Sequence, residues 1–156
     1  MVGFGYDSHK LATGKELIIG GVKIESDWGT LAHSDGDVLI HALVDALLGA
    51  AGLGDIGEHY PDTDVQYKNA DSSIFLKDAI ALLERNFLRV INIDATIILE
   101  KPKLSLYKDD IRKNIASICG MSVERVNIKA KTNEKMGFAG RSEGIVAFCV
   151  CQTTNL

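Results

Sequence analysis

The sequence of 156 residues is poor in proline and in cysteine. It contains only two prolines and three cysteines, and an odd cysteine number offers no complete disulfide framework. This cysteine usage is typical of a reducing compartment, so we expect a cytoplasmic protein, or one in the stroma of an organelle after processing. We expect no secretory signal, because the N-terminal segment lacks a basic start followed by an apolar core.

Long apolar runs and a net basic charge are missing as well. No stretch approaches the roughly 20 apolar residues of a membrane-spanning helix, and the longest, residues 42–53, is interrupted by Asp45 and glycines. The formal net charge of −4 gives no overall field that would attract nucleic acid. We therefore expect neither a membrane nor a nucleic-acid partner, although local basic groups can still bind a phosphorylated small molecule.

What is present is an ordinary globular composition, with 46% hydrophobic and 24% charged residues. A chain of this length favours one domain over residues 1–156, because two separate cores would each be small. The cysteines Cys149 and Cys151, two apart near the end of the chain, are expected to be small buried hydrophobes.

Hydrophobic periodicity predicts an α+β fold. We expect strands at residues 2–11, 17–24, 90–99, 126–132 and 145–153, and helices at residues 37–51, 71–83 and 104–119. Gly20-Gly21 predicts a bulge or bend within the second strand, and Asp35 or Asp37 a cap for the first helix. Residues 27–36 are expected to be irregular and residues 52–67 to form a loop.

The order of these elements predicts a mixed β-sheet with helices packed on one face. The other face then needs a cover. β-Branched residues at alternate strand positions indicate that sheets of partner subunits supply it, so we expect an oligomer.

The sharpest local signal is Asp7 and His9 in the first strand, followed by His41 one turn inside the first helix. Residues two apart on a strand project from the same face, so the carboxylate and the imidazole converge. Two imidazoles and one carboxylate form a common catalytic zinc set whose fourth position stays open. On spacing alone this is weak evidence, and the two histidines can instead be hydrogen-bonded residues at a strand end and a helix start.

Three further clusters carry polar side chains, each with a structural alternative. Residues 32–37 are either a polar strip beside the metal-bearing helix or turn chemistry with a helix cap, and Asp45 either orients His41 or is solvated. The glycine- and aspartate-rich residues 54–64 could bind a cation or a polyol, or act as a lid. Residues 129–141 could hold phosphates and, through Glu134, a hard cation, or form a charged turn.

Five sequence motifs, distributed along the chain, connect these clusters. They are G-Y-D-S-H at 5–9, H-S-D-G-D-V-L-I-H-A-L-V-D-A-L-L-G-A at 33–50, G-D-I-G-E-H-Y-P-D-T-D at 54–64, K-P-K at 101–103 and T-N-E-K-M-G-F-A-G-R-S-E-G at 132–144. Each motif is weak alone, but the set spans nearly the whole chain. The sequence resembles the 2-C-methyl-D-erythritol 2,4-cyclodiphosphate synthase family.

The resemblance implies a homotrimeric lyase of the non-mevalonate route to isoprenoid precursors, with sheets of three subunits facing each other and active sites at the subunit interfaces. It would convert 4-diphosphocytidyl-2-C-methyl-D-erythritol 2-phosphate to the cyclic diphosphate with release of CMP. Zn²⁺ would be held by Asp7, His9 and His41, and a second divalent cation, Mg²⁺ or Mn²⁺, by Glu134. The implied catalytic residues are Glu134, Thr132 and Asp45.

The remaining site residues also follow from the resemblance. The substrate contacts implied are His33, Ser34, Asp55, Gly57, Asp62, Phe138 and Arg141. The nucleotide contacts implied are Pro102, Lys103 and Leu104, together with Ala130, Lys131 and Thr132 of a neighbouring chain. The sequence departs from the common pattern at Lys131, Asn133 and Ser105. Arg141 with Glu143 falls where the family can accept an isoprenoid diphosphate on the trimer axis.

Two other functions are compatible with the same residues. A zinc phosphohydrolase would use water in place of the substrate's own phosphate. A non-catalytic, metal-stabilised trimer would bind a nucleotide or a lipid diphosphate, and chelation would then melt it.

Overall fold

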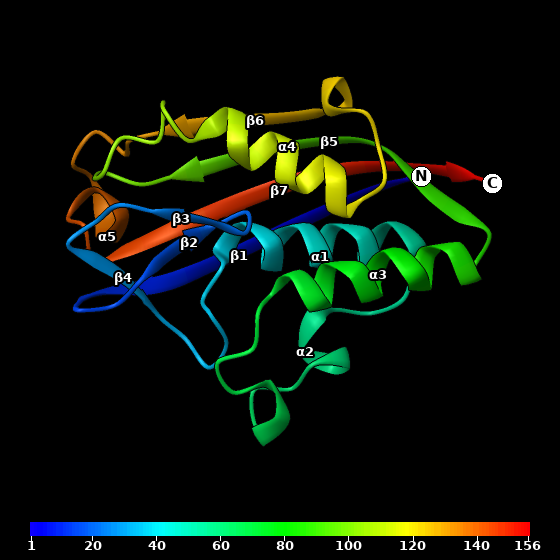
Figure 1. The fold of residues 1–156 in the computed structure, drawn as a ribbon, viewed down its shortest axis with the longest axis horizontal. Coiled ribbons are helices and arrows are strands. Elements are labelled where there is room, and N and C mark those ends of the chain that lie inside the picture. Colours follow the sequence, from blue (N-terminus) through cyan, green and yellow to red (C-terminus); the bar gives the residue numbers. More distant parts are fainter.

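The computed structural model describes residues 1–156, arranged as a five-stranded mixed sheet with three main helices on one face (Figure 1). The sheet has the order β4-β1-β7-β5-β6 and consists of β1 (Val2–Thr13), β4 (Trp28–Leu31), β5 (Leu88–Ile98), β6 (Val126–Lys131) and β7 (Gly144–Asn155). Only β5 and β6 pair in parallel. The helices are α1 (Val38–Ala51), α2 (Ile56–His59), α3 (Ser73–Arg85), α4 (Lys108–Ile118) and α5 (Gly137–Gly140), with 3₁₀ turns η1 (Val65–Tyr67) and η2 (Val123–Arg125). The α+β class and the mixed sheet are confirmed.

The α1 helix is the centre of the core, because β1 and β7 lie beneath it and α3 lies beside it (Figure 1). It begins after Asp37, whose side chain accepts the backbone N–H of Ile40 at 3.0 Å, and ends at Gly52 in the left-handed conformation. Its apolar residues belong to a cluster of 35 buried residues that also includes Cys149 and Cys151. Burial raises the pKa of both thiols, which therefore behave as small hydrophobes, as expected.

Two glycines of β1 allow α1 to lie directly on the strand. A Cβ atom at Gly5 would stand 1.8 Å from the carbonyl oxygen of Ala42, and one at Gly3 would stand 1.8 Å from that of Ala46. No side chain fits there, so the backbones of strand and helix approach more closely than usual. This approach places the first turns of α1 over the second half of β1.

The second predicted strand is instead a hairpin of β2 (Leu17–Ile19) and β3 (Val22–Ile24). Gly20 and Gly21 both have positive φ, 59° and 74°, and so form a tight turn rather than a bulge within one strand. The side chain of Asp37 accepts both of their backbone N–H groups, at 2.9 and 2.7 Å. The turn is thereby attached to the start of α1.

Other predicted boundaries were wrong in smaller ways. Residues 27–36 contain β4, which pairs with the end of β1 and so depends on a partner distant in sequence. The α4 helix begins at Lys108 rather than near residue 104, because Leu104 opens a separate turn to Tyr107. The predicted loop at residues 52–67, in contrast, is confirmed, and it includes the short α2 and η1.

The face of the sheet opposite the helices is uncovered. Apolar side chains on it are well exposed, 62% for Phe4 and 46% for Tyr6, with Val150 at 41%. Both aromatic rings pack on Phe148, with centroids 6.2 and 5.3 Å away. A contiguous apolar patch of this kind marks a contact surface.

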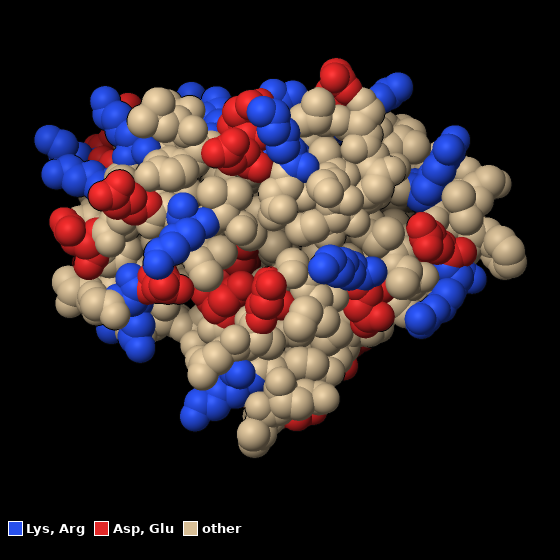
Figure 2. Space-filling view, in the orientation of Figure 1, with Lys and Arg blue, Asp and Glu red and all other residues tan.

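The helical face differs in character. Acidic and basic side chains are interspersed over it, as Figure 2 shows, without a broad field of one sign. None of the helices combines the length and the hydropathy that crossing a bilayer requires.

Candidate metal centre and substrate pocket

Asp7, His9 and His41 meet where the second half of β1 passes under the first turn of α1. Along β1, odd-numbered residues from Gly3 to Leu11 face the helices and even-numbered ones are exposed. Asp7 and His9 therefore share the face that α1 covers, as the strand period predicted. His41 lies one turn after the capping residue Asp37, with its backbone N–H donating to the Asp37 carbonyl at 3.0 Å.

The three potential ligand atoms form an almost equilateral triangle. Oδ2 of Asp7 lies 3.0 Å from Nε2 of His9 and 3.1 Å from Nδ1 of His41, and the two nitrogens are 3.1 Å apart. Ligands of a tetrahedral zinc ion at its usual bond lengths stand about 3.3 Å from one another. The residues thus fit zinc in both donor type and spacing, and each side chain is mostly buried.

The electrostatics of the triangle favour an ionised carboxylate. Burial alone would raise the pKa of Asp7, but its contacts with the ring nitrogens of His41 and His9 outweigh this effect and lower the pKa to about 2. A metal ion requires its carboxylate ligand deprotonated. Asp7 meets that requirement throughout the physiological range.

The second ring nitrogen of His41 contacts two serine hydroxyls on the far side of the imidazole. Nε2 lies 2.9 Å from Oγ of Ser72 and 3.2 Å from Oγ of Ser34. Ser72 in turn donates to the carboxylate of Asp35, which also accepts the backbone N–H of Ser72 at 3.0 Å. Sequence reasoning included Asp35 in the polar strip of residues 32–37 but treated Ser72 only as a helix-start residue, because nothing in the sequence places Ser72 beside a histidine 31 residues earlier.

Asp45, expected to orient His41 or to be solvated, has a different partner. Its Oδ1 accepts the backbone N–H of Ile56 at 2.8 Å and so ties the start of α2 to α1. Burial raises the pKa of this half-buried carboxyl. Asp45 therefore shapes the wall of the site through the loop, while Ser72 and Ser34 contact the imidazole.

A pocket of about 500 Å³ opens beside the triangle. It is lined by the three candidate ligands and by Ala32, His33, Ser34, Ile56, Gly57, Tyr60, Pro61, Asp62, Tyr67 and Phe75. Four of the seven predicted substrate contacts, His33, Ser34, Gly57 and Asp62, are thus together in one cavity. Asp55 lies outside its lining, where its side chain caps α2 by accepting the N–H of Glu58 at 3.0 Å.

The loop wall of this pocket is anchored by an aromatic cluster that sequence reasoning did not identify. The ring of Tyr60 packs on Phe75 with centroids 4.6 Å apart, and its hydroxyl donates to Asp78 at 2.5 Å. Burial, with Asp78, raises the pKa of the Tyr60 phenol. Tyr67 stands edge-on to both rings. The loop is held against α3 at this point, which limits the lid movement expected from its glycines.

The predicted second-cation residue, Glu134, lies on a tight turn after β6 and away from this pocket. Glu134 and Lys135 are both in the left-handed conformation, with φ of 52° and 60°. The turn is held by Glu100, whose carboxylate accepts the backbone N–H groups of Asn133 and Lys135 at 3.0 Å each. The side chains of Thr132 and Glu134 are exposed. Glu100 was missed because its partners lie 33 and 35 residues away.

The two predicted nucleotide segments lie side by side within one chain. Residues 102–104 follow β5 and residues 130–132 end β6, and Ile98 of β5 pairs in parallel with Lys131. The carboxyl ends of parallel neighbours meet at one edge of the sheet. Sequence reasoning divided these segments between two chains, and within one chain they already lie side by side. Leu104 is 3% exposed and packs in the core, so only its backbone is available to a ligand.

Phe138 and Arg141 complete the predicted set. Phe138 lines a shallow depression with Ser8, His9 and Glu143 on the far side of His9 from the main pocket. Arg141 is exposed and donates to the carboxylate of Glu143 at 2.8 Å. Neither residue lines the cavity that holds the triangle.

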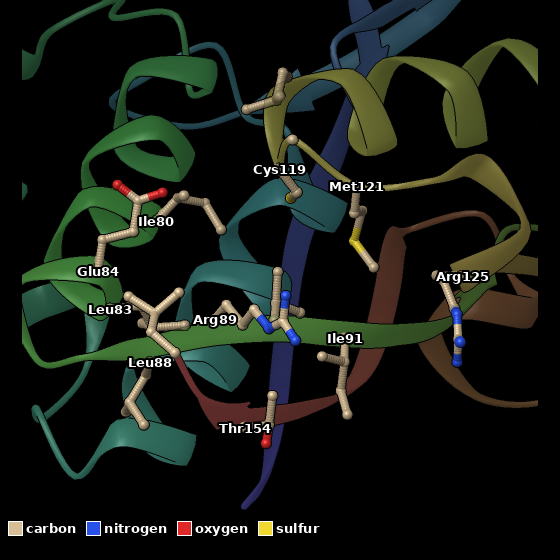
Figure 3. Close-up of a pocket in the computed structure, with 14 residues that line it drawn as sticks. Ile80, Leu83, Glu84, Leu88, Arg89, Ile91, Cys119, Met121, Arg125 and Thr154 are labelled. Atoms are coloured by element: carbon tan, nitrogen blue, oxygen red, sulfur yellow. The ribbon is translucent and has the colours of Figure 1, made fainter.

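A larger cavity, of about 690 Å³, lies at the opposite end of the sheet. Figure 3 shows it between the last turns of α3 and α4 and the first residues of β5. Among its lining residues are Leu83, Leu88 and Cys119, with Arg89 and Arg125 as cations. It lacks a cluster of metal-ligating side chains, so it is not the candidate metal centre.

Comparison with known proteins agrees with this geometry. The sequence model of the YgbB family matches residues 1–154. A 2-C-methyl-D-erythritol 2,4-cyclodiphosphate synthase from Chlorobaculum tepidum is 51% identical over 154 residues, covering 99% of this chain and 98% of the relative. One from Clostridium novyi is 52% identical over 150 residues, covering 96% of each.

Solved structures give the same result. The bifunctional IspDF from Campylobacter jejuni superposes with a TM-score of 0.96 at 44% identity over 99% of this chain, which spans 42% of that longer protein. A CDP complex of IspF from Plasmodium falciparum has a TM-score of 0.87 at 35% identity, covering 99% of this chain and 95% of the other.

Proposed function

The chain belongs to the YgbB family, and from that membership we propose how its metal centre and pocket carry out the family's reaction. It is a phosphorus–oxygen lyase that forms 2-C-methyl-D-erythritol 2,4-cyclodiphosphate in the non-mevalonate pathway. The substrate is 4-diphosphocytidyl-2-C-methyl-D-erythritol 2-phosphate, and CMP is released. The observation that carries the assignment to a site is the ligand triangle of Asp7, His9 and His41 beside a cavity of about 500 Å³.

In this reaction the substrate attacks itself. An oxygen of its 2-phosphate forms a bond to the β-phosphorus, and the bond from that phosphorus to the CMP oxygen breaks. The protein needs no nucleophile of its own; it folds the substrate into a ring-forming pose. Holding attacking and leaving groups together can lower a barrier by about 7–11 kcal/mol in favourable intramolecular cases.

The pocket residues have separate tasks in that pose. Asp7, His9 and His41 hold Zn²⁺, which supplies a Lewis acid for a phosphate oxygen when bound. Ser34 donates a hydrogen bond on the phosphate side, where His33 also lies with its Nε2 donating to the Asp64 carbonyl at 3.0 Å. Asp62 accepts a hydrogen bond from a hydroxyl of the methylerythritol. The aromatic wall of Tyr60, Tyr67 and Phe75 shields the reacting phosphates from water, which would otherwise compete as the nucleophile.

The nucleotide half of the substrate is bound by a second copy of the chain. None of Lys131, Thr132 or Glu134 lines the metal pocket of their own chain, and their side chains are exposed. Thr132 and Glu134 bind the diphosphate, with Glu134 holding Mg²⁺ or Mn²⁺ through oxygen, a ligand type that both ions favour. The CDP complex of the Plasmodium falciparum relative supports a cytidine pocket.

A homotrimer supplies this second copy. The uncovered sheet face, with Phe4, Tyr6 and Phe148, is the surface through which three sheets pack against one another. A cyclic arrangement repeats the contact between the metal pocket of one subunit and the residue 132–137 turn of the next. Each trimer then has three equivalent active sites.

The direct test is to incubate the purified protein with the cytidine-linked substrate, Zn²⁺ and Mg²⁺, and to follow products by ³¹P NMR. Cyclic diphosphate appearing with stoichiometric CMP is the expected result. Release of a linear product would indicate a zinc phosphohydrolase. No conversion by a folded, zinc-loaded protein would indicate a binding protein.

A further inference from the structure

The hydroxyl of Ser72 is used in an unusual way for a residue at the start of a helix. Ser72 stands at the N-cap of α3, where a serine normally accepts a backbone N–H of its own first turn. Here the side chain makes no such capping bond. It is fully buried and lies between Nε2 of His41 and the carboxylate of Asp35.

The direction of these hydrogen bonds can be derived from Asp35. Its two carboxylate oxygens accept the backbone N–H groups of Asp37 and Ser72, at 3.1 and 3.0 Å, which is the pattern of an ionised group. A carboxylate can only accept, so the hydroxyl proton of Ser72 points to Asp35. The oxygen of Ser72 then faces His41 as an acceptor, and the hydrogen bond between them needs its proton on Nε2.

This fixes the protonation state of the ring at the metal side. A neutral imidazole with its proton on Nε2 has a free lone pair on Nδ1, the atom that faces Asp7 and His9. We propose that Ser72 and Asp35 are positioning residues that hold His41 in the Nε2-protonated tautomer and thereby prepare Nδ1 to bind the metal. The inference rests on the proposed function only in taking the triangle as a zinc site.

Ser72→Ala is the first test, with Ser73→Ala as its matched control, since the neighbouring serine has no contact with His41. Zinc affinity is measured by competition with a chromophoric chelator. We expect Ser72→Ala to weaken zinc binding about 10–100-fold, the usual effect of removing such a partner, and Ser73→Ala to leave it unchanged. Equal zinc affinity in both variants would overturn the proposal.

The tautomer itself is the decisive readout, because a merely structural role for Ser72 would not move it. The ¹⁵N shifts of the His41 ring in the zinc-free protein should report Nε2–H in the wild type and a mixture of tautomers in Ser72→Ala and Asp35→Asn. An Nδ1–H ring in the wild type would contradict the proposal. Measurements of zinc affinity and of turnover test the proposed function and the role of Ser72 separately. A wild-type protein that binds zinc but makes no cyclic product would contradict the proposed function and leave the role of Ser72 intact.

A different observation concerns the larger cavity at the other end of the sheet. Arg89 and Arg125 line it, and neither guanidinium has a hydrogen bond or ion pair within the chain, whereas those of Arg112 and Arg141 do. Figure 3 shows Arg89 in the middle of the cavity and Arg125 to one side, with Glu84 on the opposite side. The interior between them is apolar and includes Leu83 and Cys119, 1% and 7% exposed.

An apolar cavity lined by two guanidiniums that have no hydrogen-bond partner fits one class of ligand, a phosphate monoester carried on a short apolar chain. A guanidinium suits the bidentate geometry of phosphate, and the volume of about 690 Å³ lies in the range of small-molecule pockets. The geometry points to a binding site of this class, separate from the metal pocket. The cavity lies at the end of the sheet where Leu88 of β5 pairs with Asn155 of β7. The metal site lies at the other end, where His9 of β1 pairs with Ile145 of β7.

Hexyl phosphate is the probe, titrated into the zinc-loaded protein while backbone amide shifts are recorded. We expect shifts at Cys119, Gly120 and Met121, and about tenfold weaker binding in the Arg89→Gln, Arg125→Gln double variant. Arg85→Gln, which removes another unpaired arginine outside the cavity, is the matched control and should change nothing. Shifts confined to residues of the metal pocket, or equal binding by the double variant, would overturn the assignment. Inorganic phosphate binding as tightly as hexyl phosphate would also contradict the role of the apolar cavity.

Discussion

The two polar regions of this chain are built differently. The triangle of Asp7, His9 and His41 is mostly buried, lies on a strand and a helix, and closes to 3.0–3.1 Å without any other molecule. The turn at residues 132–137 also has a defined backbone, held by Glu100, but the side chains of Thr132 and Glu134 are exposed and converge on nothing. We propose that the region of the triangle is the finished half of an active site, complete within one chain, and that the turn is the exposed half, which acts on a neighbouring subunit.

The largest effect should come from removing a ligand in the finished half. We expect His41→Ala to reduce zinc from about one ion per subunit to near zero and turnover by at least about 10³-fold. The fold should survive, because the hydrophobic core does not depend on this imidazole. Elemental analysis and circular dichroism check both points. His59→Ala is the control, since His59 bonds the Leu53 carbonyl away from the triangle and should keep its zinc; full zinc occupancy in His41→Ala would refute the ligand assignment.

A smaller loss is expected in the exposed half. Glu134→Gln keeps the shape of the side chain but removes the charge that holds the second cation, so turnover should fall about 10²-fold with zinc still bound. Parallel measurements of turnover and zinc content distinguish the two regions. Near-normal activity would count against a cation role for Glu134.

Mixing the two inactive variants tests directly whether the halves belong to different chains. If each active site combines His41 of one subunit with Glu134 of the next, trimers assembled at random from equal amounts of His41→Ala and Glu134→Gln contain intact sites. Each half is intact with a chance of one in two, so about a quarter of wild-type activity should return. Co-refolding followed by assay measures it, and native mass spectrometry counts the subunits. Activity no higher than that of the separate variants would place the whole site in one chain.

The smallest expected effect concerns how rigidly the finished half is held. Asp37, which caps α1 and carries the β2–β3 turn, is fully buried, and burial raises its pKa to about 6 despite its N–H donors. A carboxyl with a raised pKa stabilises the fold below its unfolded value near 4, and this contribution is lost as the pH rises to about 6. Relative to Asp37→Asn, the unfolding free energy of the wild type should therefore decline by about 2–3 kcal/mol between pH 4 and pH 6.5. Urea denaturation at several pH values measures it, and parallel pH profiles would contradict the prediction.

Sequence patterns predicted the parts of the site that depend on local geometry. Asp7 and His9 converge because of the two-residue period of a strand, and His41 follows because Asp37 fixes where α1 begins. The hairpin at Gly20-Gly21 was not predicted, because two successive glycines are compatible with either a bulge or a turn. Contacts that depend on packing between distant elements, such as Ser72 with His41 and Glu100 with Asn133, leave no local signal at all.

The resemblance to a family supplied what local patterns could not. It grouped Glu134, Thr132 and the residues after β5 into one function, although composition alone made them a charged turn. It did not show that residues 102–104 and 130–132 lie side by side within one chain, since strand order is decided by long-range pairing of β5 with β6. The uncovered aromatic face followed from alternation in β1, where every second residue points away from the helices.

Gly3 and Gly5 determine how closely the strand and the helix that carry the candidate ligands approach each other. With no Cβ between strand and helix, the distance from β1 to α1 is set by backbone atoms, which neither change rotamer nor compress. Ligand distances in a zinc site tolerate only about 0.2 Å of error, so we expect the position of His41 relative to Asp7 and His9 to depend on this contact. A single methyl group at Gly5 would push α1 outward and carry His41 away from Asp7 and His9, whose own separation on β1 would not change. The spacing of the candidate ligands therefore depends in part on two residues that would never touch the ion.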